Sequence, residues 1–216
     1  RRSVKKIKKK NKKFDNNEFN KIIKKFGFEL SYDQKSAIDQ INNDLKSNQK
    51  MFRLLQGDVG SGKTIVALIA SANVISSGFQ VSLMAPTEIL AKQHYDLAKK
   101  LLNKNLNIKI LTSKTDRKER KEILKDLSSN KIHFLIGTHS LYQEKIQYNN
   151  LGLVIIDEQH KFGVRQRKKL SDKGGKNCDV LVMSATPIPR TMIMTIFGDM
   201  DTSIIKTKPK NRKEIK

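Results

Sequence analysis

The stretch GDVGSGKT at residues 57–64 constrains the fold of this chain more than any other. It fits the pattern G-x-x-x-x-G-K-[ST] and lies between an apolar run, RLLQ, and a second apolar run, TIVALIASANVI. In a strand–loop–helix unit, such a loop wraps its backbone N–H groups around phosphate oxygens, and its lysine reaches the β- and γ-phosphates. The pattern therefore predicts a strand, a phosphate-binding loop and a helix, in that order.

Short apolar runs alternate with amphipathic stretches along the rest of the chain. The runs that indicate strands are RLLQ, QVSLMAP, IKILT, HFLIG, LGLVIIDE and DVLVMSA. Helical patterns lie between most of them, and residues 87–102 place one set of side chains on a single helical face: Leu90, His94, Leu97, Ala98 and Leu101. This alternation predicts an α/β fold with a mostly parallel sheet flanked by helices, and with the glycine loop at the ligand-binding carboxyl end of a strand.

A second acidic element follows the apolar strand LGLVIID. Asp157 ends this run and Glu158 comes next. A phosphate cradle hydrolyses nothing by itself, because it needs a carboxylate to hold a metal ion and another to polarise the attacking water. We therefore expect Asp157 in the shell of a Mg²⁺ ion and Glu158 beside the water, with a nucleoside triphosphate on the loop.

The charge of the chain has two interpretations. There are 44 lysines and arginines against 21 acidic residues, a formal net charge of +23. Such an excess indicates a polyanionic partner. Lysines outnumber arginines by 35 to nine, however, and Asn and Ile are plentiful, so a compositional bias explains the same numbers. Residues 1–25 hold a dense lysine run, which we interpret as a solvated helix or a disordered arm, with the folded domain beginning near Phe26 and Ser31 as a helix cap.

Cysteine content and hydropathy bear on the location of the protein. The single cysteine, Cys178, excludes a disulfide within the chain and favours a reducing compartment. No apolar run approaches the ~20 residues of a membrane span, and the basic start leads into polar residues instead of a signal-peptide core. We therefore expect a soluble, cytoplasmic protein with no membrane partner.

Further motifs carry a resemblance to a known family. DEQH, MSATPIPRT, MAPTEILAKQH and IGTHSL resemble the first motor domain of superfamily 2 helicases. GDVGSGKT, DEQHKFGVRQR and GDMD resemble the RecG family of bacterial DNA helicases in particular, from about Phe26 to Lys216. Transcription-repair coupling factors, an alternative, share GDVG and ATPIPRT but carry DEEQRFGV where this chain has DEQHKFGV.

The resemblance implies a RecA-like P-loop domain that uses ATP and Mg²⁺ to unwind and remodel branched DNA, such as stalled forks and Holliday junctions. The phosphate loop matches at Gly57, Asp58, Val59, Gly60, Ser61, Gly62, Lys63 and Thr64, with Lys63, Thr64, Asp157 and Glu158 as the catalytic set and Thr64 and Asp157 as the metal ligands. The adenine would meet Gln34 and Phe28. The residues that relay the nucleotide state to DNA would be His160, Ser184 and Thr186. The residues that touch the DNA backbone would be Pro86, Thr87, Glu88, Gly137, Thr138 and His139; helix capping is an alternative role for Thr87 and Thr138.

The same resemblance divides the chain into parts. Residues 1–25 would be a basic linker or arm, residues 26–205 the first motor domain, and residues 206–216 the start of a connection to a second RecA-like domain. That second domain and an N-terminal wedge domain lie outside this sequence, so the chain is either a fragment or a truncated gene product. Because the second domain supplies arginines to the γ-phosphate, we expect the isolated chain to hydrolyse ATP poorly. If the isolated chain hydrolyses ATP well, a catalytic arginine must lie within it, and Arg190 is the first candidate. A basic nucleic-acid-binding module that holds ATP without hydrolysing it is the alternative.

Overall fold

The computed structural model describes residues 7–15, 17–143, 145–157, 172–186 and 200–206. Its centre is a seven-stranded sheet in the order β3-β4-β2-β5-β6-β1-β7, in which all neighbouring strands pair in parallel. The strands are β1 (Phe52–Gly57), β2 (Gln80–Met84), β3 (Ile108–Leu111), β4 (Phe134–Gly137), β5 (Leu151–Asp157), β6 (Asp179–Ser184) and β7 (Asp201–Ile205). The helices are α1 (Asn17–Phe26), α2 (Tyr32–Lys46), α3 (Lys63–Ser76), α4 (Glu88–Leu101) and α5 (Arg117–Ser128), with short 3₁₀ turns η1 (His139–Tyr142) and η3 (Gly175–Asn177).

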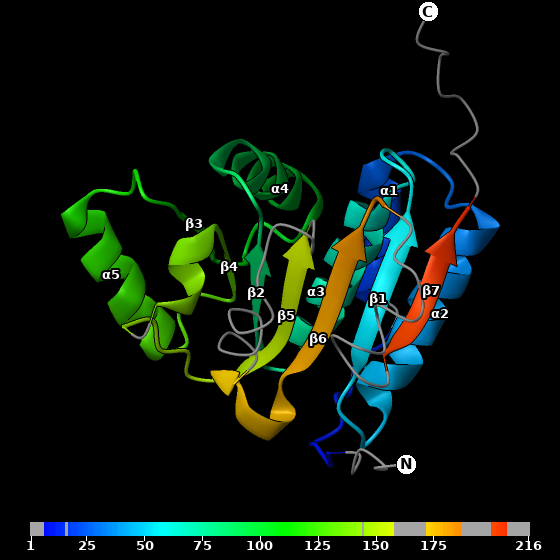
Figure 1. Ribbon diagram of the computed structural model, residues 1–216, viewed down its shortest axis with the longest axis horizontal. Coiled ribbons are helices and arrows are strands. Elements are labelled where there is room, and N and C mark those ends of the chain that lie inside the picture. The colour runs from blue at the N-terminus through cyan, green and yellow to red at the C-terminus, as the bar shows by residue number, and fades with distance from the viewer. Residues whose placement is uncertain (1–6, 16, 144, 158–171, 187–199, 207–216) are drawn as a thin grey trace, which may run out of the picture.

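Helices cover both faces of this sheet, as the alternation of side chains along each strand requires (Figure 1). Leu55 faces a core shared with α1, α2, α3 and α4, whereas its neighbour Leu54 faces a second core that contains residues of α5 and η1. The predicted α/β class with a parallel sheet is confirmed, and so are the six predicted strands. In the described part of the chain, no helix combines the length and the apolar character that crossing a bilayer takes.

Helix positions follow from local sequence signals. Ser31 caps α2 as predicted: its hydroxyl accepts from the backbone N–H of Gln34, whose side chain accepts from the Ser31 N–H in return. Of the predicted face of α4, His94, Ala98 and Leu101 are buried, and Leu90 and Leu97 are partly buried against the same core. Ala91, which was not predicted, is buried as well. Strand β7 was not predicted, because only Ser203 and Ile205 of this edge strand face inward and the pattern is too short to read.

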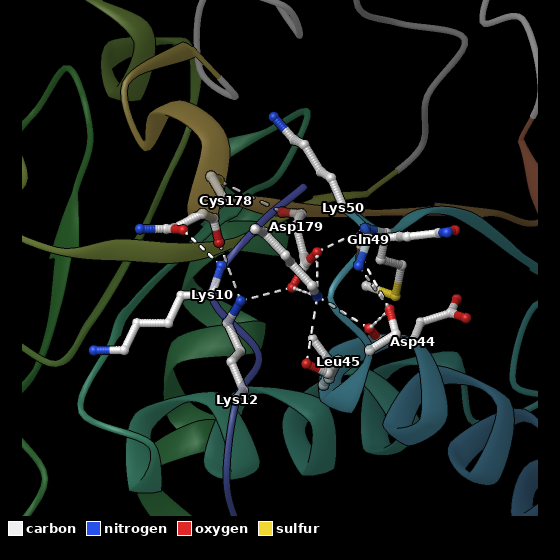
Figure 2. Close-up of polar contacts among 12 residues, drawn as sticks. Lys10, Lys12, Asp44, Leu45, Gln49, Lys50, Cys178 and Asp179 are labelled. Carbon is white, nitrogen blue, oxygen red and sulfur yellow. Dashed lines mark hydrogen bonds and ion pairs between the residues drawn. The ribbon is translucent and has the colours of Figure 1, made fainter. Parts of the chain in front are cut away.

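The N-terminal lysine segment corrects the sequence analysis. Within the described residues it is not a solvated or disordered arm, because residues 8–12, which we call the strap, dock on the core (Figure 2). The side chains of Lys9 and Lys12 are fully buried, and both lie 2.6 Å from the Asp179 carboxylate at the start of β6. Helix α1 then packs Ile22 into the main core. The folded domain therefore begins well before Phe26.

Backbone hydrogen bonds hold the strap along the turn between α2 and β1. The N–H of Lys9 donates to Asn48 O at 2.8 Å, and the N–H of Lys12 donates to Leu45 O at 3.1 Å. Burial lowers the pKa of Lys9, against the opposing attraction of Asp179. Because β6 starts at Asp179 and the sheet is parallel, the strap crosses the amino ends of the strands, opposite to the end that carries the glycine loop (Figure 1).

Candidate functional site

The glycine loop leaves β1 at Gly57 and enters α3 at Lys63, as the spacing predicts. Gly60 and Gly62 have φ angles of 80° and 86°, in the left-handed region that L side chains rarely adopt. A Cβ on Gly62 would also overlap the Gln34 side chain, and a Cβ on Gly57 would crowd the Ser61 hydroxyl. Side chains are therefore excluded at these glycine positions for two separate reasons, a left-handed backbone conformation and the close approach of neighbouring atoms.

The inside of the loop presents donors to a ligand. Lys63 Nζ donates to Gly57 O at 2.6 Å and to Asp58 O at 3.0 Å, so its ammonium lies over the loop. The hydroxyl of Ser61 is buried and has no hydrogen-bond partner among the described residues. Val59, at the tip, is 73% exposed. An ammonium and an unsatisfied hydroxyl behind an open loop fit a chain of phosphate groups.

The two residues predicted to meet adenine lie on or before α2. Gln34 Nε2 donates to Ser61 O at 2.8 Å, which ties the first turn of α2 to the phosphate loop. A glutamine amide has two N–H groups and two lone pairs, so this bond and the cap leave capacity for a base edge. Phe28 is 62% exposed and packs edge to face on Phe26, with ring centroids 5.6 Å apart. Their contacts with adenine remain predictions.

Asp157 ends β5 with a buried carboxylate at the same edge of the sheet as the loop. Only β6 lies between β5 and β1, so the two backbones are about 10 Å apart, a gap that side chains and a hydrated Mg²⁺ ion can span. Thr64 stands in the first turn of α3, directly after the loop that follows β1. The donor set suits Mg²⁺, which prefers a carboxylate, a hydroxyl and water. Glu158 and His160 lie outside the described residues.

His94 has a role that the sequence analysis missed. Its Nε2 lies 2.7 Å from Asp157 Oδ2, so the imidazole N–H donates to the carboxylate, and both residues are buried. The only signal in the sequence was a polar ring on the apolar face of α4. This arrangement resembles the carboxylate–histidine pairs that orient metal ligands in other proteins.

Ser184 and Thr186 lie at the carboxyl end of β6, the strand between β1 and β5. Ser184 ends β6, and its hydroxyl donates to Thr186 O at 3.1 Å. The Oγ atoms of the two residues are 3.3 Å apart. Because β6 separates β1 from β5, this turn lies between the phosphate loop and Asp157. The position agrees with the predicted relay, which stays a prediction.

A pocket of about 380 Å³ opens beside the start of α4. Its lining residues are Pro86, Thr87, Glu88, Ser113, Arg120, Thr138, His139, Ser140 and Gln143. The pocket brings together all the residues predicted to touch DNA except Gly137. Position 137 nevertheless requires glycine, because a Cβ there would overlap Leu111 O. Thr87 caps α4 by accepting from Leu90 N at 3.2 Å, whereas Thr138 makes no capping bond. The alternative role as a helix cap is therefore confirmed for Thr87 and wrong for Thr138.

The pocket contains a carboxylate that is paired with a lysine and a guanidinium that is not paired with an acid among the described residues. Glu88 accepts from the Ser113 hydroxyl at 2.6 Å and pairs with Lys114 at 3.3 Å, and these contacts lower its pKa, the Ser113 hydrogen bond most. Arg120, from α5, donates to the neutral Gln143 Oε1 at 2.6 Å and forms no ion pair in the described parts of the chain. The pocket therefore offers a guanidinium to an anion. Arg120 was not predicted, because nothing in the run RKERK sets it apart from its neighbours.

Comparisons with known proteins place this geometry in context. The model of the DEAD/DEAH box helicase family matches residues 31–195. The ATP-dependent DNA helicase RecG of Aquifex aeolicus is 51% identical over 197 residues, 90% of this chain and 25% of the relative. RecG of Bacillus subtilis is 50% identical over 204 residues, 94% of this chain and 30% of the relative.

Solved structures agree with these relatives. A structure of RecG bound to a three-way DNA junction superimposes with a TM-score of 0.83 at 43% identity, over 96% of this chain and 28% of that one. A DEAD box protein from Methanococcus jannaschii gives a TM-score of 0.68 at 25% identity, over 89% of this chain and 54% of that one. The chain thus spans between 25% and 30% of the length of the RecG relatives.

Proposed function

The chain belongs to the DEAD/DEAH box helicase family, and on that premise we propose that it is the ATP-binding motor of a RecG-like helicase that remodels branched DNA. One observation carries the proposal: the same edge of the sheet holds a phosphate loop with a facing carboxylate and, beside it, a pocket suited to phosphodiesters. The RecG relatives and the structure of RecG on a three-way junction support the choice of DNA as the second ligand.

The nucleotide chemistry is assigned to residues of the loop and of β5. Lys63 and the backbone N–H groups of Gly60–Thr64 bind the β- and γ-phosphates of ATP. Thr64 and Asp157 would hold Mg²⁺, which neutralises charge on the phosphate oxygens when it is bound. Glu158 would polarise the attacking water. Phosphoryl transfer depends on positioning and charge, and these are what the loop and the two acids supply.

The pocket supplies contacts that do not depend on base sequence. Thr87 and Thr138 offer hydroxyls, the N-terminus of α4 offers backbone N–H groups, and Arg120 offers a planar pair of donors. These groups bind phosphate oxygens and leave the base edges untouched. A motor that moves along DNA of any sequence needs this kind of contact, so the pocket suits translocation better than site recognition.

The proposal includes the setting of the protein. A second RecA-like domain and an N-terminal wedge are proposed as parts of the parent protein, in agreement with the longer RecG relatives. A cytoplasmic location is proposed as well.

Cys178 is a buried free thiol whose pKa is raised to about 12 by burial, so it stays protonated and unreactive under ordinary conditions.

The direct test is ATP hydrolysis by the protein as its gene encodes it, with and without forked DNA. We expect forked DNA to stimulate steady-state phosphate release, because the two sites share one edge of the sheet. Hydrolysis that is indifferent to DNA would contradict the proposal. The alternative, a nucleic-acid-binding module with ATP as a structural ligand, predicts binding of both ligands and no turnover.

Replacing Arg120 by glutamine tests the pocket. The variant keeps a planar amide beside Gln143 but removes one phosphate-binding charge, so the slope of log K against log salt should fall by about one for any DNA sequence. Fluorescence anisotropy with labelled fork DNA at several salt concentrations measures the slope. Lys121→Gln is the matched control, since Lys121 is exposed on the same helix outside the pocket. Equal slope changes in both variants would refute a specific contact at Arg120.

A further inference from the structure

Helix α4 has one end in the pocket and its middle at the carboxylate. Thr87 caps the helix, and Thr87 and Glu88 line the pocket. Seven residues after Thr87, His94 reaches Asp157 at hydrogen-bonding distance, 2.7 Å. An α-helix rises 1.5 Å per residue, so about 10 Å of continuous helix separates the pocket from the Asp157 contact. One helix thus touches both parts of the proposed machinery.

The packing of α4 makes it suited to move as one body. Ala91, Ala98 and Leu101 are buried in the core on the side of β3 and β4. At its far end, Lys25 Nζ donates to Leu102 O at 2.8 Å, which ties the helix to α1. A small residue at positions 91 and 98 lets the helix lie close to the sheet. Because close-packed elements shift as units, a displacement at the first turn reaches His94.

We propose that His94 is a positioning residue that links DNA bound in the pocket to the orientation of the Asp157 carboxylate. The inference rests on the proposed function, since it takes Asp157 as the residue that would hold Mg²⁺ and the pocket as the DNA site. His94 touches neither ligand itself and acts through Asp157. This path differs from the relay expected of His160, Ser184 and Thr186, because it runs through α4 and β5.

The physical basis is the burial of the pair. A carboxylate in water rotates among many hydrogen-bonded arrangements, but Asp157 is buried and His94 Nε2 fixes one of its oxygens. A shift of α4 therefore changes the direction of the other oxygen, Oδ1, which is the oxygen that would meet a metal ion. Conversely, a ligand that fixes Asp157 holds His94 and with it the first turn of α4. The coupling is reciprocal, so it can be measured as a binding effect.

The test is the factor by which a non-hydrolysable ATP analogue with Mg²⁺ changes the dissociation constant for fork DNA. It is measured by fluorescence anisotropy on the protein as its gene encodes it. Couplings between sites are typically 5- to 150-fold, so we expect at least about a fivefold factor in the wild type. His94→Asn should lower the factor severalfold, because the shorter amide does not reach Asp157, and any coupling that remains would pass through the separate relay expected of His160, Ser184 and Thr186. DNA affinity without nucleotide should stay within about twofold of the wild type.

A matched pair of variants separates positioning from a structural role. His94→Gln places an amide nitrogen near the position of Nε2, so it should restore most of the factor. His133→Asn removes an imidazole at the other end of the sheet, where His133 Nδ1 accepts from Asn107 N, and should leave the factor unchanged. Thermal unfolding of each variant reports its fold, and the comparison of Gln with Asn holds even if His94→Asn is less stable.

The outcomes are distinct for the two proposals. An undiminished factor in a folded His94→Asn protein overturns the inference, as does a Gln variant that behaves like Asn. A wild-type protein that binds both ligands with no coupling between them also overturns the inference, while the hydrolysis test of the proposed function is unaffected. A wild-type protein that binds no ATP analogue or no DNA overturns the proposed function itself.

Discussion

Replacing Lys63 by alanine is expected to lower DNA-stimulated ATP turnover by about 10²- to 10³-fold, the usual effect of removing one charge-stabilising donor from an active site. The ammonium of Lys63 lies over the loop, bonded to Gly57 O and Asp58 O, where the β- and γ-phosphates would lie. The fold should survive, because Lys63 is the first residue of α3 and alanine is a strong helix former. Steady-state phosphate release with saturating fork DNA measures the effect.

The control for this variant is Lys104→Ala, which removes an exposed lysine between α4 and β3. It changes the net charge by the same amount and should leave turnover within about twofold of the wild type. Calorimetric titration with ATP analogue separates binding from chemistry. Unchanged affinity and turnover in a folded Lys63→Ala protein would show that the loop is not the phosphate site.

The second large effect is on stability, at the opposite end of the sheet. Asp179→Ala should lower the free energy of unfolding by about 3–5 kcal/mol, because it leaves two fully buried ammonium groups without a counter-charge. The variant also removes the acceptor of the Met51 N–H, which Asp179 holds at 2.7 Å. The midpoint of urea denaturation, followed by circular dichroism, gives the change.

Two further variants test whether buried charge causes the loss of stability in Asp179→Ala. Asp126→Ala removes a partly exposed carboxylate whose ion pair with Lys131 is 3.9 Å long, and should cost less than about 1 kcal/mol. The combined replacement of Lys9 and Lys12 by methionine and Asp179 by leucine should recover most of the stability, since an apolar cluster carries no uncompensated charge. Equal, small losses for Asp179→Ala and Asp126→Ala would mean that the strap is not held by buried charge.

The sheet was predictable because its strands are buried on both faces. A run such as LGLVIID is too short for a typical helix and rich in Val and Ile, so it favours a strand, and its apolar residues on both faces favour a position between two layers of helices. Strand β7 lacks this signal, since three of its five side chains are exposed. The strap lacks it more completely. Lysine side chains are usually exposed to solvent, and Lys9 and Lys12 are buried only because they pair with Asp179, which is distant in the sequence.

The candidate site divides in the same way. The phosphate loop was predictable from spacing within eight residues, and Asp157 from its place at the end of an apolar strand. The residues expected to touch DNA lie together because parallel strands bring their carboxyl ends to one edge. The pairs His94–Asp157 and Arg120–Gln143 join residues 63 and 23 positions apart, and they depend on how helices pack against the sheet. A short sequence pattern does not predict contacts of this kind between distant residues.

The strap has a consequence for the order in which the chain folds during synthesis. Lys9 and Asp179 are 170 residues apart, so the ribosome releases the lysines long before their counter-charge. At synthesis rates of roughly 5–20 residues per second, that delay is on the order of ten to thirty seconds. Until β6 emerges, Lys9 and Lys12 remain hydrated, and the amino end of the sheet stays open. Two lysines that are translated early in this domain therefore reach their native contacts only after β6 has emerged, when most of the sheet has already been synthesised.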